Sequence, residues 1–163
     1  MIRRLVHYVT LAALVLVIAG WALFLRPQSL GGPAAYVVIR GSSMVPAFET
    51  GDLVIVRAAS SYAVGDVVAY EVPDGEIGAG HIVIHRIVGG DGSNGFTLQG
   101  DNNNTPDPWM PRATDIVGRA WLSVSALGRV IAYVHQPVIV AAIAAALIMT
   151  LILARQPARA KAA

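Results

Sequence analysis

The chain has 163 residues, no cysteine and a hydrophobic content of 55%. The lack of cysteine excludes disulfides, thiolate nucleophiles and cysteine zinc sites. The formal net charge is +2, and six of the twelve basic residues flank two apolar stretches near the ends of the chain. The positive charge therefore indicates membrane topology and not a basic patch for nucleic acid.

The first expected element is a transmembrane helix over residues 5–25. These 21 residues carry few polar side chains, and their length is about that needed to cross a ~30 Å hydrocarbon core. A cleavable signal peptide is the alternative, and the basic start at Arg3 and Arg4 fits it. The apolar stretch is long for a signal peptide, and no small-x-small cleavage site precedes Arg26. We therefore expect a retained anchor.

The middle of the chain, residues 27–129, is predicted to be an all-β domain. Short apolar runs alternate with Gly, Asp, Asn and Pro turn signals, and no helical period competes with them. Gly-Asp pairs recur at the edges of these runs, where turns favour both residues. The expected strands are Ala35–Arg40, Asp52–Arg57, Asp66–Val72, His81–Val88, Phe96–Gln99 and Asp115–Val124.

A second transmembrane helix is expected over residues 133–154. The apolar run from Val138 to Ala154 is at the short limit for a span, and Pro137 before it suits the first turn of a helix. Tyr133 and Val134 would lengthen the run. The sequence thus predicts a β domain held on the membrane by two helices.

Arginine and lysine are enriched on the cytoplasmic side of membrane proteins. By this rule both ends of the chain, residues 1–4 and 155–163, are predicted to be cytoplasmic, and the domain between the spans is extracytoplasmic. That domain holds ten acidic residues and six arginines, a net charge of −4 before histidines. The charge argues against a nucleic-acid partner.

A candidate nucleophile follows the first span closely, in the run Gly41-Ser42-Ser43-Met44-Val45-Pro46. Glycine allows a substrate to approach the backbone, and the methionine and proline would hold the turn. A Gly-Ser-Ser sequence alone is usually a simple turn. Ser43 becomes a candidate because the rest of the domain supplies a base and a carboxylate.

The base is chosen largely by elimination. The one lysine, Lys161, falls on the expected cytoplasmic tail, so a Ser-Lys dyad is excluded if the topology is right. The domain contains two histidines, His81 and His85, four residues apart and therefore on one face of a strand. A neutral imidazole is available as a base at ordinary pH. A packed or solvated strand histidine is the simpler interpretation of either.

Asp101 and Asp107 are the candidate carboxylates, and the residues alone leave open which of them orients the base. Both lie in an Asx-rich loop, where such residues commonly bond their own backbone. A calcium loop is another interpretation, because the loop offers many oxygens. Its spacing does not match an EF-hand, and no glutamate closes it, so we do not favour a metal.

Together these segments resemble type I signal peptidase, in the branch of the endoplasmic reticulum, archaea and some Gram-positive bacteria that uses histidine in place of lysine. The resemblance runs from about Tyr36 to Trp121, with its motifs in the right order. The motifs are Gly41-Ser42-Ser43-Met44-Val45-Pro46, Gly51-Asp52-Leu53-Val54, Val64-Gly65-Asp66-Val67-Val68-Ala69-Tyr70, Ile84-His85-Arg86-Ile87-Val88 and Gly100-Asp101-Asn102-Asn103, with Asp107 following.

The resemblance implies Ser43 as nucleophile and His85 as base, with Asp101 and Asp107 both important and Asp107 favoured as the partner of the base. It implies a β-rich, partly barrel-like catalytic domain with an exposed peptide groove near the membrane. One position departs from the family, because Gly41 stands where a serine often helps to bind the oxyanion. The second oxyanion donor therefore has no assignment from the sequence.

The implied function is that of a membrane-bound serine endopeptidase that cleaves signal peptides from exported preproteins, with no metal or cofactor. Small side chains are expected at the first and third positions before the cut. Expected partners are these signal peptides, membrane lipid and the secretion machinery. Two alternatives remain open: a processing peptidase for a few secreted or pilin-like clients, and a non-catalytic peptide-binding homologue.

Overall fold

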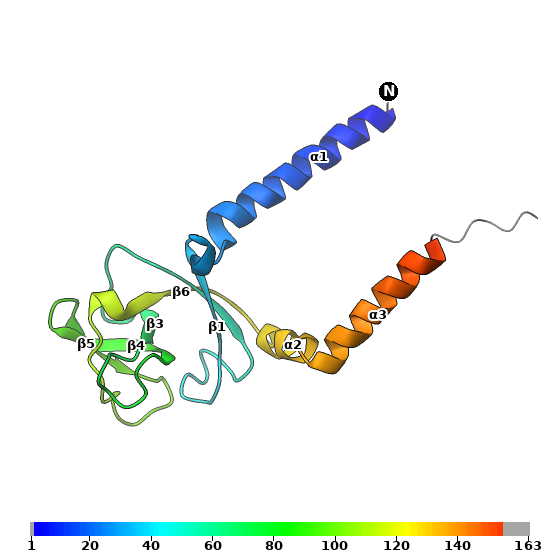
Figure 1. Ribbon diagram of the computed structural model, residues 1–163. Coiled ribbons are helices and arrows are strands. Elements are labelled where there is room, and N and C mark those ends of the chain that lie inside the picture. Colours follow the sequence, from blue (N-terminus) through cyan, green and yellow to red (C-terminus); the bar gives the residue numbers. More distant parts are fainter. Residues whose placement is uncertain (1, 155–163) are drawn as a thin grey trace, which may run out of the picture.

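The computed structural model describes residues 2–154 (Figure 1). The helix α1 (Ile2–Gly20) continues into the π-helical turn η1 (Trp21–Leu25) and extends away from the sheet domain. After the sheet come two further helices, α2 (Leu127–Val134) and α3 (Pro137–Ala154). The expected cytoplasmic tail at 155–163, with Lys161, lies outside the described residues.

The domain is a six-stranded antiparallel sheet in the order β1-β2-β6-β3-β4-β5. All six expected strands are present, with no end shifted by more than three residues. Strand β6 lies between β2 and β3, so the last strand in the sequence joins the two halves of the sheet. The strands are β1 (Ala34–Val38), β2 (Leu53–Arg57), β3 (Val67–Glu71), β4 (Ile82–Asp91), β5 (Gly95–Gln99) and β6 (Ile116–Val124).

The sheet is open, and this differs from the partly barrel-like domain expected from the sequence. Its outer strands, β1 and β5, each pair with one neighbour and not with each other. Register shifts in three strand pairs bend the sheet, as bulges do. The short β5 pairs only with the second half of β4, so the bend does not close the sheet into a barrel.

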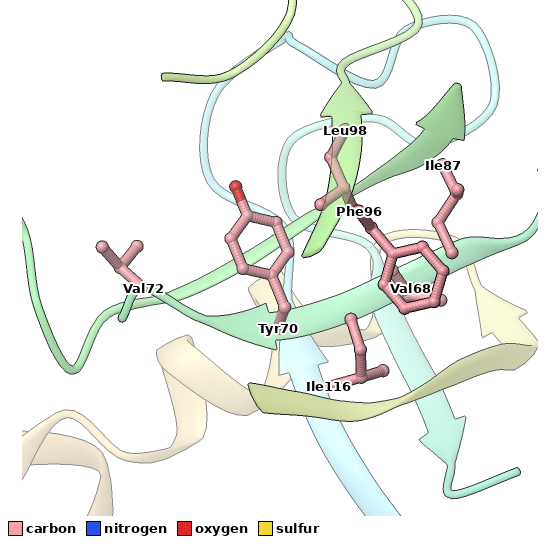
Figure 2. Close-up of a cluster of buried hydrophobic side chains, with 7 residues drawn as sticks. All are labelled: Val68, Tyr70, Val72, Ile87, Phe96, Leu98 and Ile116. Carbon is pink, nitrogen blue, oxygen red and sulfur yellow. The ribbon is translucent and has the colours of Figure 1, made fainter. Parts of the chain in front are cut away.

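The sheet carries a hydrophobic cluster on each face, because β3 and β4 are central strands with apolar residues at consecutive positions. Figure 2 shows the first cluster, formed by Val68, Tyr70, Val72, Ile87, Phe96, Leu98 and Ile116. The second cluster contains Ile39, Met44, Val54, Val56, Ala69 and Ile84. Alternation along β3 explains the division, since Val68 and Tyr70 point to one face and Ala69 to the other.

The described residues include one helix long and apolar enough to span a membrane, from Arg3 to Leu25. The helices α2 and α3 qualify only as a bent pair, with an angle of 69° between them. The break falls just before Pro137, whose ring cannot continue a helix from the preceding turn. Tyr133 and Val134 therefore belong to α2 and do not lengthen α3.

The end of the N-terminal helix is joined to the sheet by aromatic contacts. The guanidinium of Arg57 lies 5.6 Å from the ring centre of Phe24 and 5.0 Å from that of Trp121, distances typical of cation–π pairs. The hydroxyl of Tyr36 donates a hydrogen bond to the carbonyl of Leu25. Strands β1 and β2 thus contact this helix end directly, and β6 supports it through Arg57.

Candidate active site

The Ser43 turn is held in place from two sides. Next to it, Met44 is 1% exposed and packs into the second hydrophobic cluster, which anchors the turn to the sheet. From the other side, the backbone N–H of Asn102 donates to the carbonyl of Ser43 at 2.8 Å. The Asn102 side-chain amide also donates to the carbonyl of Ser42, at 3.2 Å. The half-buried Ser43 therefore has a fixed backbone and a side chain that reaches open space.

His85 lies on β4 and bridges Ser43 and Asp107. Its Nε2 atom is 2.9 Å from Oγ of Ser43, and its Nδ1 atom is 2.6 Å from Oδ2 of Asp107. An ionised carboxylate only accepts hydrogen bonds, so Nδ1 carries the proton and Nε2 of the neutral ring accepts from the serine hydroxyl. This tautomer is the one that can take a proton from Ser43.

Asp107 is placed by the loop that follows β5. Its backbone N–H donates to the carbonyl of Leu98 at 2.7 Å, which ties the loop back to the strand. The side chain is 6% exposed, and Oδ2 also accepts a hydrogen bond from the hydroxyl of Tyr70 at 2.8 Å. Burial, followed by the contact with Asp107, raises the pKa of Tyr70, so this hydroxyl stays protonated and donates.

Asp101 lies apart from the chain of contacts through His85. Both of its carboxylate oxygens accept from Arg86, at 2.6 and 2.8 Å, in a two-pronged ion pair. The same arginine donates to the carbonyl of Gly65. These hydrogen bonds from Arg86 to Asp101 raise the pKa of the guanidinium. Asp101 thus joins its loop to β4 and to the turn before β3.

The two histidines of the domain have different surroundings. His85 is 7% exposed and lies between two polar partners. His81 is exposed, and its Nδ1 atom lies 2.9 Å from the carbonyl of Gly78 in the turn before β4. The structure therefore brings Ser43, His85 and Asp107 together, and it leaves His81 and Asp101 outside this group.

A groove of about 470 Å³ reaches Ser43 and His85 between two strand edges. One side is the outer edge of β1, which pairs with no strand except β2 and is met at its first residue, Ala34, by Pro27 alone. The other is the first half of β4, where Ile82–His85 pair with β3 alone. Apolar side chains dominate the lining: Ala35, Val37, Val38, Ile39, Met44, Ile82, Val83, Ile84 and Val117. Such a groove can accept an extended chain and bond its backbone.

The acidic side chains near the site have partners within the part of the chain from residue 2 to 154. No group of three or more His, Asp or Glu side chains there is arranged to hold an ion. The carboxylates of the proposed calcium loop are already used, since Asp101 accepts from Arg86 and Asp107 accepts from His85 and Tyr70. These carboxylates are thus occupied by hydrogen bonds from neighbouring side chains.

Two neighbours of the site were not singled out from the sequence, Tyr70 and Gly100. In the pairing of β3 with β4, Val68 is opposite His85, so Tyr70 is its diagonal neighbour on the same face. A Cβ atom on Gly100 would lie 2.6 Å from the carbonyl oxygen of Ser43 and 3.0 Å from Nε2 of His85. The signal for Tyr70 was the alternation along β3, and Gly100 gave a signal only as part of a Gly-Asp turn.

The match to known families covers the same region as the site. The model of Peptidase S24-like proteins matches residues 12–121. This range includes the end of the N-terminal helix, the groove, and Ser43, His85 and Asp107. The chain belongs to the Peptidase S24-like family. Within the family it is a type I signal peptidase homologue of the endoplasmic-reticulum branch, as its curated relatives show.

Three of those relatives are named as signal peptidase complex catalytic subunit SEC11. The protein from Metarhizium acridum is 34% identical over 105 residues, which are 62% of this chain and 58% of the relative. That from Dictyostelium discoideum is 30% identical over 115 residues, 65% and 64% of the two chains. That from Ogataea parapolymorpha is 32% identical over 130 residues, 69% and 73%. The chain thus spans less than two thirds of the first two relatives.

Proposed function

We propose that this peptidase S24-like protein is a membrane-bound serine endopeptidase that cleaves N-terminal signal peptides from exported preproteins. The observation that carries the proposal is the hydrogen-bonded series Ser43–His85–Asp107 at the end of a groove with two free strand edges. The relatives named as catalytic subunits of a signal peptidase complex support the same function.

In the proposed mechanism, Ser43 Oγ attacks the scissile carbonyl while His85 Nε2 takes the hydroxyl proton. His85 then donates that proton to the leaving amine as the peptide C–N bond breaks, which leaves an acyl ester on Ser43. A water molecule, deprotonated by His85, hydrolyses the ester and restores the serine. Asp107 keeps the imidazole in the required tautomer and stabilises its charged form.

The developing oxyanion needs hydrogen-bond donors, and we assign the first to the backbone N–H of Ser43. None of the hydrogen bonds among residues 2–154 uses this N–H. Gly41 supplies no hydroxyl as a second donor. Its φ of +92° and the open space beside it leave room for the substrate carbonyl and its donors.

The substrate is proposed to lie extended in the groove, between the edges of β1 and β4. Backbone groups on these edges would bond the substrate main chain, which gives affinity without dependence on side chains. The lining near Ser43 is aliphatic, with Ile39, Met44 and Ile84. An aliphatic lining suits the small apolar side chains expected at the first and third positions before the cut.

The arrangement in the membrane is proposed from the charges beside the helices. With α1 as an anchor and α3 as a second span, the sheet domain is extracytoplasmic and both ends are cytoplasmic. A protease added to spheroplasts should then cut a tag placed in the Asp91–Asn94 turn but not a tag after Ala163. Protection of the Asp91–Asn94 tag would refute this topology.

Because the relatives are named as subunits of a complex, we also propose partner subunits for this chain.

The test is incubation of the detergent-purified full chain with a preprotein. Wild-type protein should release the mature product. Ser43→Ala should lose turnover by about 10³-fold or more, because the covalent route is gone. Ser42→Ala is the matched control and should cleave within a few-fold of wild type. An active Ser43→Ala would refute the proposal, and an inactive wild type would favour a peptide-binding homologue. A panel of unrelated preproteins separates general processing from work on a few clients.

A further inference from the structure

Tyr70 connects the hydrophobic core to the proposed catalytic residues. Its ring is fully buried in the first cluster, between β4 and β6 on the central strand β3. Figure 2 shows the hydroxyl directed away from Val68 and Ile116, toward the edge of the cluster. There it donates to Oδ2 of Asp107 at 2.8 Å. The packed ring therefore gives this hydroxyl a fixed position.

The same oxygen of Asp107 receives two hydrogen bonds. One comes from Tyr70, and the other, at 2.6 Å, from Nδ1 of His85. A donor on a carboxylate draws negative charge toward itself and limits rotation of the group. Tyr70 thus affects both where Asp107 points and how strongly Asp107 attracts a proton to the imidazole.

We propose that Tyr70 is a positioning residue for the reaction, which fixes Oδ2 of Asp107 and weakens the hold of Asp107 on a protonated His85. This role rests on the proposed function. Tyr70 touches neither the substrate nor Ser43 and acts only through the carboxylate. The neutral imidazole is the form that serves as a base.

The sign of the effect follows from the charge. Removal of the hydroxyl in Tyr70→Phe leaves Asp107 with more unshared negative charge, so the imidazolium is favoured. The acid limb of the kcat/KM profile should move to higher pH by about half a unit to one unit, or roughly 3- to 10-fold lower kcat/KM on the acid side. On the alkaline plateau a smaller decrease should remain, from looser orientation of the ring.

Tyr62 provides the matched control. Its ring packs edge-on against Phe96 in the same cluster, and its hydroxyl accepts a hydrogen bond from the backbone N–H of Ala59. Tyr62→Phe also removes a tyrosine hydroxyl beside the first cluster, but this hydroxyl does not contact Asp107. It should lower the melting temperature at most, and leave the pH profile unchanged.

The experiment compares full-length wild type, Tyr70→Phe and Tyr62→Phe in detergent micelles with two measurements. The first is the pH profile of preprotein cleavage. The second is an NMR titration of the protein labelled with 15N-histidine, with the His85 signal assigned from His85→Ala. Upward movement of both the acid limb and the His85 titration midpoint in Tyr70→Phe alone supports the inference. Unchanged values in Tyr70→Phe, or equal movement in Tyr62→Phe, overturn it.

Three further results keep the inference separate from the proposed function. In an Asp107→Asn background, Tyr70→Phe should change kcat/KM no further, and an additive loss would mean a purely structural role. If the wild type cleaves no preprotein, the proposed function fails while the NMR titration still tests the effect of Tyr70 on His85.

Tyr70→Phe could melt too low to assay. In that case 3-fluorotyrosine at position 70, a stronger hydrogen-bond donor, should move the His85 titration midpoint to lower pH. Movement to higher pH would overturn the inference.

Discussion

A methyl group on Gly100 would lie 3.0 Å from Nε2 of His85, the atom that faces Ser43. It would also lie 2.6 Å from the carbonyl oxygen of Ser43, a distance that real Cβ atoms do not tolerate. The loop that carries the two aspartates thus passes so close to the Ser43 turn that its first residue has no room for a side chain. Glycine is required here for close approach, and the backbone is not left-handed.

Gly100→Ala should therefore damage the site before it damages the sheet. Displacement of Ser43 or His85 lengthens their hydrogen bond, and we expect kcat/KM to fall by up to about 100-fold, as for a misplacement on the order of 1 Å. Gly89→Ala is the control, because a Cβ there would meet Thr97 at an ordinary 3.8 Å. Kinetics beside thermal melts measure both effects. Near-normal kcat/KM in Gly100→Ala would contradict the close approach.

The two histidines should respond differently to substitution. His85→Ala removes the base and should lower turnover by at least a thousand-fold, an order-of-magnitude expectation for a residue acting with its partners as a unit. His81→Ala should stay within a few-fold of wild type, since its contact is with the carbonyl of Gly78. His85→Lys should not restore activity, because Asp107 would hold the ammonium in its charged form. Equal loss at both positions, measured with one preprotein, would reject His85 as the base.

Asp107→Asn and Asp101→Asn should separate orientation from loop stability. An amide at position 107 can present its NH₂ group to Nδ1 and select the wrong tautomer of His85, so turnover should fall about 10³- to 10⁴-fold with little change in melting temperature. Asp101→Asn weakens the ion pair with Arg86 and should lower the melting temperature by a few degrees, with about ten-fold or smaller loss of activity.

Melting curves and cleavage rates on the same preparations distinguish these two variants. The melting temperature of wild type should be the same with and without a chelator of divalent cations. A chelator-dependent melt that disappears in Asp101→Asn or Asp107→Asn would revive the calcium interpretation. Near-normal turnover in Asp107→Asn would remove the carboxylate from the mechanism and leave Ser43 and His85 alone.

Asp52 should contribute to stability in a pH-dependent way. The backbone N–H groups of Glu49 and then Ala126 hold its pKa below the ordinary value of 3.8. A depressed pKa means that the carboxylate stabilises the fold above pH 3.8, and that this contribution is lost as the pH falls through the folded-state value. The melting temperature of wild type should exceed that of Asp52→Asn at pH 7, and the difference should shrink toward pH 2.5. A constant difference across this range would assign the role of Asp52 to shape alone.

The elements of the fold were predictable because their signals are local. Each strand shows as an apolar run between turn residues, and Gly51 and Gly65 adopt the positive φ that their Gly-Asp turns require. Openness of the sheet was not predictable, since it depends on how far β5 extends beside β4. The break between α2 and α3 had a local signal in Pro137, but the apolar content on both sides hid it.

The sequence indicated a serine, a histidine and an aspartate for the site. It did not show how the loop after β5 runs, and therefore which aspartate contacts His85. Spacing left Asp101 and Asp107 equal, because both lie in the loop that follows β5. The backbone bond from Asp107 to Leu98 turns the loop inward, and Arg86 draws Asp101 outward. For Tyr70, the alternation along β3 gives the face of the sheet, but the connection between β3 and β4 leaves open which residue of β3 lies opposite His85.

The stacking of Arg57 between Phe24 and Trp121 makes the connection between helix and sheet rigid and not flexible. With α1 in a bilayer, a rigid connection would keep Ser43 at a constant distance from the lipid surface. Under the proposed function, a substrate anchored in the same bilayer would present to Ser43 the peptide bond that lies at this distance from the lipid. The choice of peptide bond would then depend on Arg57, which does not line the groove.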